Sequence, residues 1–272
     1  NYDSHNFLNP PLANKEIIYN VHDKEYVDYI FDNIPDTGFS YFDPDTVACP
    51  NSLNSYLCAV GGSVDAVNQI NLNKNKKVFF CAHRPPGHHA EKNKAMGFGV
   101  FNNVAISADY ALRSKKFEKI LIIDFDVHHG NGTQHIFENN PNIFYASSHQ
   151  YPYYPGTGDL TEKGCGNIFN CPLPANCDSK LFRKLFSENI VDKINQNFDL
   201  LYFSAGFDAH VLDPLASINL EDEDFFWITK KILDKFANNI PIISVLEGGY
   251  DMKGLYNGLN NHLKVLQDYS YE

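Results

Sequence analysis

Short apolar runs rich in Val, Ile and Phe recur along the chain, and longer stretches with helical spacing separate them. The apolar runs are continuous rather than alternating, which is typical of strands buried on both faces of a sheet. They cover residues 78–82, 119–124, 142–146, 199–204 and 241–246. The helical stretches cover residues 101–112, 179–195 and 221–237. Strands that alternate with helices in this way predict a parallel sheet with helices on both faces.

Polar residues follow four of these apolar runs directly. In chain order, the runs lead into Arg-Pro-Pro-Gly-His-His, Asp-Phe-Asp-Val-His-His, Ala-Gly-Phe-Asp and Glu-Gly-Gly-Tyr. In parallel α/β sheets, ligands bind beyond the carboxyl ends of the strands. Four strand ends that deliver His, Asp and Tyr to one edge of the sheet therefore predict an active site there.

The second of these motifs has the composition of a metal site. In extended backbone alternate side chains project to the same side, so Asp124, Asp126 and His128 are expected to share one side. Asp208, at another strand end, adds a further carboxylate. One imidazole with carboxylate oxygens suits a divalent first-row ion such as Zn²⁺. The alternative is a set of solvated loop residues that cap a helix beginning near Gly132.

The other motifs carry residues suited to acid–base chemistry and to binding an aliphatic chain. His88 and His89 follow two prolines and a glycine, and imidazoles held beside a metal can serve as base and acid. A Tyr250 hydroxyl near a metal can donate to a developing oxyanion. Loop aromatics such as Phe98 and Tyr154 can form a narrow slot for an aliphatic stem. The alternatives are surface histidines, a structural tyrosine and aromatic rings that only fill space.

Composition narrows the class of protein. The 272 residues contain no internal repeat, linker or charge shift, so a single domain is expected across residues 1–272. The net charge of -11 argues against direct nucleic-acid binding and favours a cationic substrate. A mean hydropathy of -0.34, without a long apolar stretch, argues against membrane insertion. Six cysteines without a CxxC pair favour reduced thiols in a cytoplasmic protein, although export into another cell stays open.

Taken together, six motifs resemble those of the histone deacetylase and acetylpolyamine amidohydrolase family, with features of its class II members. They are Arg-Pro-Pro-Gly-His-His-Ala, Gly-Phe-Gly-Val-Phe-Asn-Asn-Val-Ala, Asp-Phe-Asp-Val-His-His-Gly-Asn-Gly-Thr-Gln, Tyr-Pro-Gly-Thr-Gly-Asp, Ala-Gly-Phe-Asp-Ala-His and Glu-Gly-Gly-Tyr. The match runs from about Leu12 to Leu266. It implies a three-layer α/β/α fold of the arginase/deacetylase type, with a mainly parallel sheet of about eight strands. It also implies that the family's amino-terminal strand and helix are missing.

The resemblance implies a role for each residue of the predicted site. The implied zinc ligands are Asp126, His128 and Asp208. The implied catalytic residues are His89 as general base, His88 as its electrostatic and acid partner, Tyr250 as oxyanion donor, Asp124 orienting His88, and Asn131 orienting His89.

The resemblance also implies a substrate tunnel and a second metal site. Phe98 and Tyr154 would form the tunnel walls, Gly97 would line the tunnel, and Leu215 would lie on its rim. A structural potassium ion would be held by Asp124 and Ser147 and by backbone oxygens of Asp126, His128 and Ser148.

The implied reaction is hydrolysis of an acetylated amine to acetate and a free amine. Dedicated polyamine deacetylases place acidic residues at the pocket mouth, so Leu215 mildly favours acetyl-lysine in a peptide or protein. Asp43 and Asp45 lie near the rim and either contact a substrate or form a turn. A deacetylase of small acetylated amines and a catalytically silent acetyl-lysine-binding protein are the alternatives. Retention of Tyr250 and of every implied zinc ligand argues against the silent protein.

Overall fold

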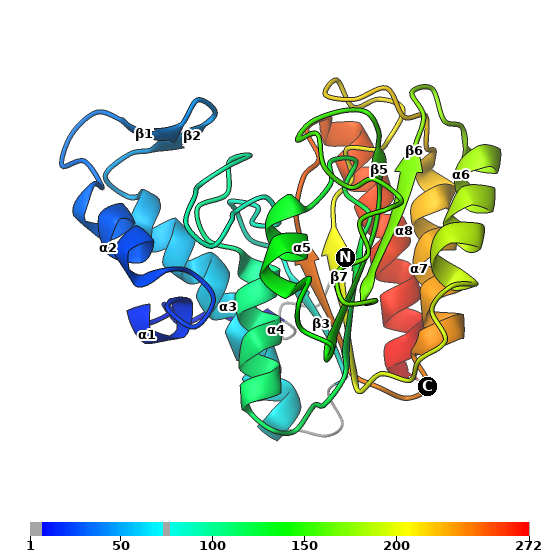
Figure 1. Cartoon of the computed structure of the whole chain (residues 1–272), viewed down its shortest axis with the longest axis horizontal. Coiled ribbons are helices and arrows are strands. Elements are labelled where there is room, and N and C mark those ends of the chain that lie inside the picture. The colour runs from blue at the N-terminus through cyan, green and yellow to red at the C-terminus, as the bar shows by residue number, and fades with distance from the viewer. Residues whose placement is uncertain (1–6, 73–76, 272) are drawn as a thin grey trace.

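A six-stranded parallel sheet forms the centre of the molecule (Figure 1). The structure is a computed structural model that describes residues 7–72 and 77–271. In spatial order the strands are β3 (Val78–Cys81), β8 (Ile242–Leu246), β7 (Leu200–Ala205), β4 (Ile120–Asp124), β5 (Ile143–Gln150) and β6 (Ile168–Leu173). Every neighbouring pair runs parallel. The prediction of a parallel sheet and of its five strands is therefore confirmed.

Both faces of the sheet are covered by helices, as the continuous apolar runs predicted. Successive residues of β4 enter different hydrophobic clusters, with Ile120 and Ile122 in one and Leu121 and Ile123 in the other. One face is covered by α3 (Ser52–Leu72), α4 (Asn103–Arg113) and α5 (Asn131–Phe137), with α1 (Lys15–Ile18) and α2 (Lys24–Asp32) beyond them. The opposite face is covered by α6 (Ser179–Phe186), α7 (Asp222–Phe236) and α8 (Met252–Tyr271). These are the three layers of the predicted α/β/α fold.

The predicted helices begin where their caps lie. The Asn102 side chain accepts from the Ala105 N–H at the start of α4, and Glu221 and Asp224 form a capping box at the start of α7. The helix predicted over 179–195 is wrong at its end, because α6 stops at Phe186 and continues as a π-helical segment, η2 (Ser187–Val191). There the Ser187 hydroxyl donates to the Arg183 carbonyl, which competes with regular helix geometry.

The described residues contribute six strands to this sheet, whereas the resemblance implied about eight. The remaining strands, β1 (Ser40–Asp43) and β2 (Thr46–Ala48), pair with each other as an antiparallel hairpin that stands apart from the sheet (Figure 1). The Asp45 N–H donates to the Asp43 carboxylate in the hairpin turn, so the Asp-Pro-Asp run does form a turn. Within residues 7–72 and 77–271, no helix is both long and apolar enough to cross a bilayer.

Candidate active site

The loops that follow β3, β8, β7 and β4 meet at one edge of the sheet. These strands are spatial neighbours, so their carboxyl ends lie side by side. His88, from the loop after β3, contacts Asp124 at the end of β4. The Gly248 N–H, after β8, donates to Asp126, after β4, over 2.8 Å. His128 contacts Asp208, after β7. The four predicted strand-end motifs thus form one site.

Asp126, His128 and Asp208 form a compact buried cluster. Their ligand-type atoms all lie within 4.8 Å of one another. His128 Nδ1 lies 3.0 Å from Asp208 Oδ2 and 3.2 Å from Asp126 Oδ1. Burial and the nearby Asp126 charge raise the pKa of Asp208 to about 7. Two carboxylates held this closely, with one imidazole, are a donor set that fits a divalent cation such as Zn²⁺.

The adjacent histidines have opposite electrostatic surroundings. Burial lowers the pKa of His88, but the carboxylates of Asp126 and Asp124 outweigh burial and raise it to about 10. His88 Nδ1 lies 3.0 Å from Asp124 Oδ2. Burial and the charge on His88 hold the pKa of His89 well below its usual value. The pair therefore combines a protonated imidazole with a neutral one, which suits an acid and a base.

Backbone geometry at Gly97 allows His89 to occupy its position. A Cβ atom at Gly97 would lie 2.3 Å from His89 Cδ2, and the residue adopts a φ of +56°. Only glycine meets both requirements without strain. The next residue, Phe98, also has a positive φ of 63°, and its ring lies 5.9 Å from that of Tyr250. The Gly-Phe-Gly motif thereby places one aromatic wall beside the histidine pair.

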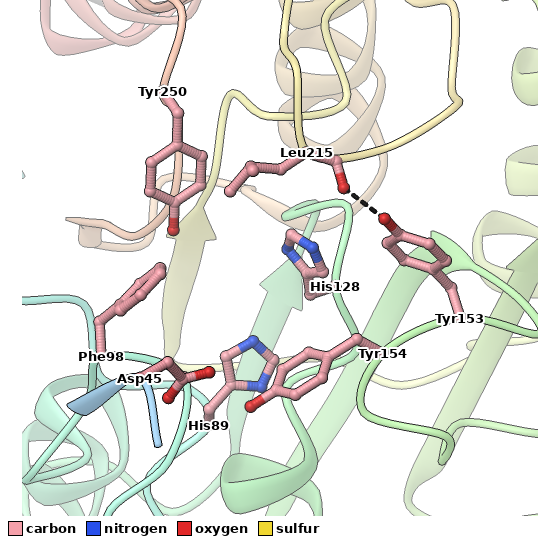
Figure 2. Close-up of a pocket in the computed structure, with 9 residues that line it drawn as sticks. Asp45, His89, Phe98, His128, Tyr153, Tyr154, Leu215 and Tyr250 are labelled. Carbon is pink, nitrogen blue, oxygen red and sulfur yellow. Dashed lines mark hydrogen bonds between the residues drawn. The ribbon is translucent and has the colours of Figure 1, made fainter. Parts of the chain in front are cut away.

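A narrow cavity of about 170 Å³ leads to the cluster (Figure 2). It is lined by Asp45, His89, Gly97, Phe98, His128, Tyr153, Tyr154, Leu215 and Tyr250. The lining therefore includes the four residues to which the family resemblance gave a place in the substrate tunnel, Gly97, Phe98, Tyr154 and Leu215. In Figure 2, Phe98 and Tyr154 lie on either side of His89, and Tyr250 points its hydroxyl into the cavity.

Tyr153 and Asp45 are additional lining residues. The Tyr153 hydroxyl donates to the Leu215 carbonyl over 2.6 Å, and its ring stacks on His128 at 5.9 Å. Tyr153 therefore connects Leu215 to His128, which belongs to the Asp126–His128–Asp208 cluster. Asp45, which the sequence analysis placed near the rim, reaches the cavity from the turn of the hairpin.

The residues predicted to hold potassium are also neighbours. Asp124 and Ser147 are paired in the β4–β5 register, and both are buried together with Ser148. However, Asp124 Oδ2 accepts from the Tyr145 hydroxyl, and the Ser147 hydroxyl contacts His149 Nδ1 at 2.9 Å. The potassium site stays a prediction.

The sequence reasoning missed two buried carboxylates that hold the loops of the site. Glu247 accepts from the Gly87 N–H at 2.7 Å and from the Ser204 hydroxyl at 3.0 Å, and burial raises its pKa to about 7. A charged residue directly after a buried apolar strand was a signal for this role. Asp213 accepts from the backbone N–H groups of Leu215, Tyr250 and Asp251. Its sequence context offers no comparable signal.

Loss of the Asp213 carboxylate should destabilise the protein. Asp213→Ala leaves three backbone N–H donors without their acceptor, so the free energy of unfolding should fall by about 1–3 kcal/mol. Urea titration followed by circular dichroism measures this change. The matched control is Asp268→Ala, since Asp268 is exposed on α8. Equal stability of both variants would contradict the anchoring role.

The fold and the site together indicate a class of protein. A buried Asp-His-Asp cluster and a histidine pair, at the strand ends of a parallel α/β sheet, fit a hydrolase that could hold a divalent metal ion. The family model described as the histone deacetylase domain matches residues 1–266. The chain belongs to the histone deacetylase family, which supports deacetylase activity in general.

Individual relatives agree with this family. The chain is 39% identical to histone deacetylase 14, chloroplastic, of Arabidopsis thaliana, over 93% of this chain and 64% of that protein. It is 34% identical to a probable deacetylase of Methanothermobacter thermautotrophicus, over 98% of this chain and 80% of that protein. The crystal structure of the HDA15 HD domain superposes with a TM-score of 0.88 at 33% identity, covering 96% of this chain and 76% of that one. The sequence-based family and fold class are therefore confirmed.

Proposed function

We propose that the protein is a zinc-dependent deacetylase that removes acetyl groups from acetyl-lysine in proteins or peptides. The observation that carries this proposal is the buried Asp126–His128–Asp208 cluster beside a cavity of about 170 Å³ lined by aromatic side chains. Such a cavity suits an unbranched aliphatic stem with an amide at its end. We also propose that residues 1–272 act as one domain.

In this proposal Asp126, His128 and Asp208 hold the zinc ion. When bound, zinc supplies a Lewis acid that polarises the amide carbonyl and lowers the pKa of a water molecule. His89, kept neutral by burial, takes the proton of the attacking water. A protonated histidine of the pair then donates a proton to the leaving amine. Phe98 and Tyr154 enclose the stem and exclude bulk water.

Tyr250 serves as the oxyanion donor in this mechanism. Its hydroxyl points into the cavity (Figure 2), and burial together with the Asp126 and Asp208 carboxylates raises its pKa. The phenol therefore keeps its proton at neutral pH and donates a hydrogen bond to the developing oxyanion. Asp124 orients His88, and Asn131 orients His89 from 2.8 Å.

Two features of the rim bear on the choice of substrate. Leu215 is an apolar rim residue, 38% exposed, which favours a lysine stem over a polycation. Asp45 is a carboxylate at the same cavity and favours the second candidate, a small acetylated amine with a further positive charge. We rank acetyl-lysine first, because histone deacetylases are among the relatives.

Parallel rate measurements test the proposal. We expect purified protein to bind about one zinc ion and to cleave an acetyl-lysine peptide with a kcat/KM at least about tenfold above that for acetylpolyamines. Zinc is measured by elemental analysis, and acetate release by a coupled assay. Asp208→Asn should lose zinc, whereas the control Asp268→Asn should retain it. If zinc-loaded protein cleaves neither substrate, the proposed deacetylase activity is ruled out.

Three further predictions accompany this proposal, on a second metal ion, on location and on the partner. A structural potassium ion would use Asp124 and Ser147 with backbone oxygens of Asp126, His128 and Ser148. The cytoplasmic location stays a prediction, since two relatives are named chloroplastic. The acidic net charge of -11 supports a basic, lysine-rich protein partner over nucleic acid.

A further inference from the structure

His88 and His89 differ in the group that each Nδ1 atom contacts. Asp124 contacts His88 Nδ1 directly, so this histidine has a carboxylate as its immediate partner. His89 Nδ1 instead contacts Oδ1 of Asn131 at 2.8 Å. An amide has two chemically different ends, and its orientation decides whether it accepts from or donates to the imidazole. The neighbours of Asn131 therefore determine which nitrogen of His89 carries the proton.

Each group that contacts the Asn131 Nδ2 atom is a hydrogen-bond acceptor. Nδ2 lies 2.5 Å from Glu91 Oε1, 3.3 Å from the His89 carbonyl oxygen and 3.6 Å from Met96 Sδ. An ionised carboxylate only accepts, so the NH₂ group must face Glu91 and Oδ1 must face His89. His89 consequently carries its proton on Nδ1 and leaves Nε2 as the basic nitrogen.

Glu91 is itself held from several sides. His135 Nδ1 lies 2.8 Å from Glu91 Oε1 and 3.0 Å from Oε2. His135 and Asn131 lie four residues apart on α5, so one helix face presents both groups to Glu91. The Glu91 carbonyl lies 2.8 Å from His22 Nδ1, and its N–H donates to the Lys94 carbonyl. The Glu91 side chain is only 18% exposed.

We propose that Glu91 is a positioning residue for the base: through Asn131 it fixes the His89 tautomer, and His135 holds it in place. The inference rests on the proposed function, in which His89 accepts the proton of the attacking water. A carboxylate one amide away also polarises Asn131, so that Oδ1 becomes a stronger acceptor and stabilises the imidazolium that forms. Glu91 thus orients His89 through Asn131, whereas Asp124 orients His88 by direct contact.

Exchanging the carboxylate of Glu91 with the amide of Asn131 tests this arrangement. Glu91→Gln offers Asn131 both a donor and an acceptor, so the amide orientation is no longer imposed. Asn131→Asp alone places two carboxylates together. The double variant Glu91→Gln/Asn131→Asp keeps the net charge and places a carboxylate directly on His89 Nδ1. We expect each single variant to lose about 10–100-fold in kcat/KM, mostly in kcat, and the double variant to recover most of that loss.

A second measurement reports the tautomer without relying on turnover. In ¹⁵N-histidine-labelled protein, the nitrogen shifts of His89 distinguish the two neutral tautomers, and His89→Gln assigns the signal. The parent should show the Nδ1-protonated form, and Glu91→Gln should show a mixture. His135→Ala, at a half-exposed position, should shift the same signal less far. The matched control is Glu188→Gln, at an exposed position of η2 on the opposite face of the sheet.

The outcomes separate this inference from the proposed function. An unchanged His89 tautomer in folded Glu91→Gln would overturn the inference, as would a double variant no more active than the weaker single variant. If Glu91→Gln fails to fold, an unchanged tautomer in His135→Ala decides against it. If the parent cleaves no acetylated substrate, the proposed function fails, and the tautomer comparison alone decides the role of Glu91.

Discussion

Tyr250→Phe is expected to lower kcat on an acetyl-lysine peptide by about 10²–10³-fold, which is the usual effect of removing one oxyanion donor. The substitution removes only the hydroxyl. The ring contact with Phe98 at 5.9 Å can persist, and the backbone N–H of residue 250 still donates to Asp213. Zinc content and KM should therefore stay within about twofold of the parent, because the lost interaction forms only in the transition state.

Steady-state kinetics and elemental analysis on the same preparations check this expectation. Tyr256→Phe is the matched control, since Tyr256 is 68% exposed on α8 and does not line the cavity. An unchanged kcat in Tyr250→Phe would exclude the oxyanion role. A parallel loss of zinc would instead indicate that the hydroxyl supports the metal cluster.

Gly248→Ala is expected to weaken zinc binding by about 100-fold and to abolish most turnover, although residue 248 supplies no ligand. A Cβ atom there would lie 2.5 Å from Asp208 Oδ2 and 2.6 Å from Asp126 Oδ2. Both carboxylates would have to move, and the bond from the Gly248 N–H to Asp126 would be strained. The φ of Gly248 lies outside the left-handed region, so alanine can adopt this backbone conformation. Any loss of zinc affinity would therefore come from crowding of the two carboxylates and not from backbone strain.

Competition with a zinc-binding dye measures the affinity of this variant. Gly62→Ala is the matched control, because residue 62 lies inside α3 and does not line the cavity, and its Cβ would meet only the Pro10 side chain, at 3.2 Å. In a helix interior, alanine is also favoured over glycine. Full zinc affinity in Gly248→Ala would show that these carboxylates do not hold the metal.

The sheet was largely predictable because β4 and β7 are buried along their whole length, which leaves continuous apolar runs in the sequence. β6 was not predicted, because Asn170 and Pro172 interrupt its apolar pattern. The strand tolerates Pro172 because it lies at the edge of the sheet. α3 escaped because it is buried on more than one side and contains Gly61 and Gly62, which weaken its helical periodicity.

The site was predictable where a single strand end carries several functional groups. Asp126 and His128 lie on one short segment, and a parallel sheet brings Asp208 to the same edge. The supporting contacts were not predictable in this way. Glu247 meets Gly87 across 160 positions of sequence, and Asp213 joins the segments of Leu215 and Tyr250. Such contacts depend on tertiary packing, which local patterns do not encode.

The Asp213 carboxylate joins the Leu215 segment to the Tyr250 segment, so in the proposed function it would couple substrate selection at the rim to the rate of the chemical step. One carboxylate oxygen holds the segment of Leu215 and the other holds the segment of Tyr250, so the two segments share a support. A bulky group that displaces Leu215 would therefore also disturb Tyr250, the proposed oxyanion donor. Ill-fitting substrates would be rejected through slow turnover rather than through weak binding. Engineering of the rim for larger acyl groups will consequently need a compensating change on the Tyr250 segment.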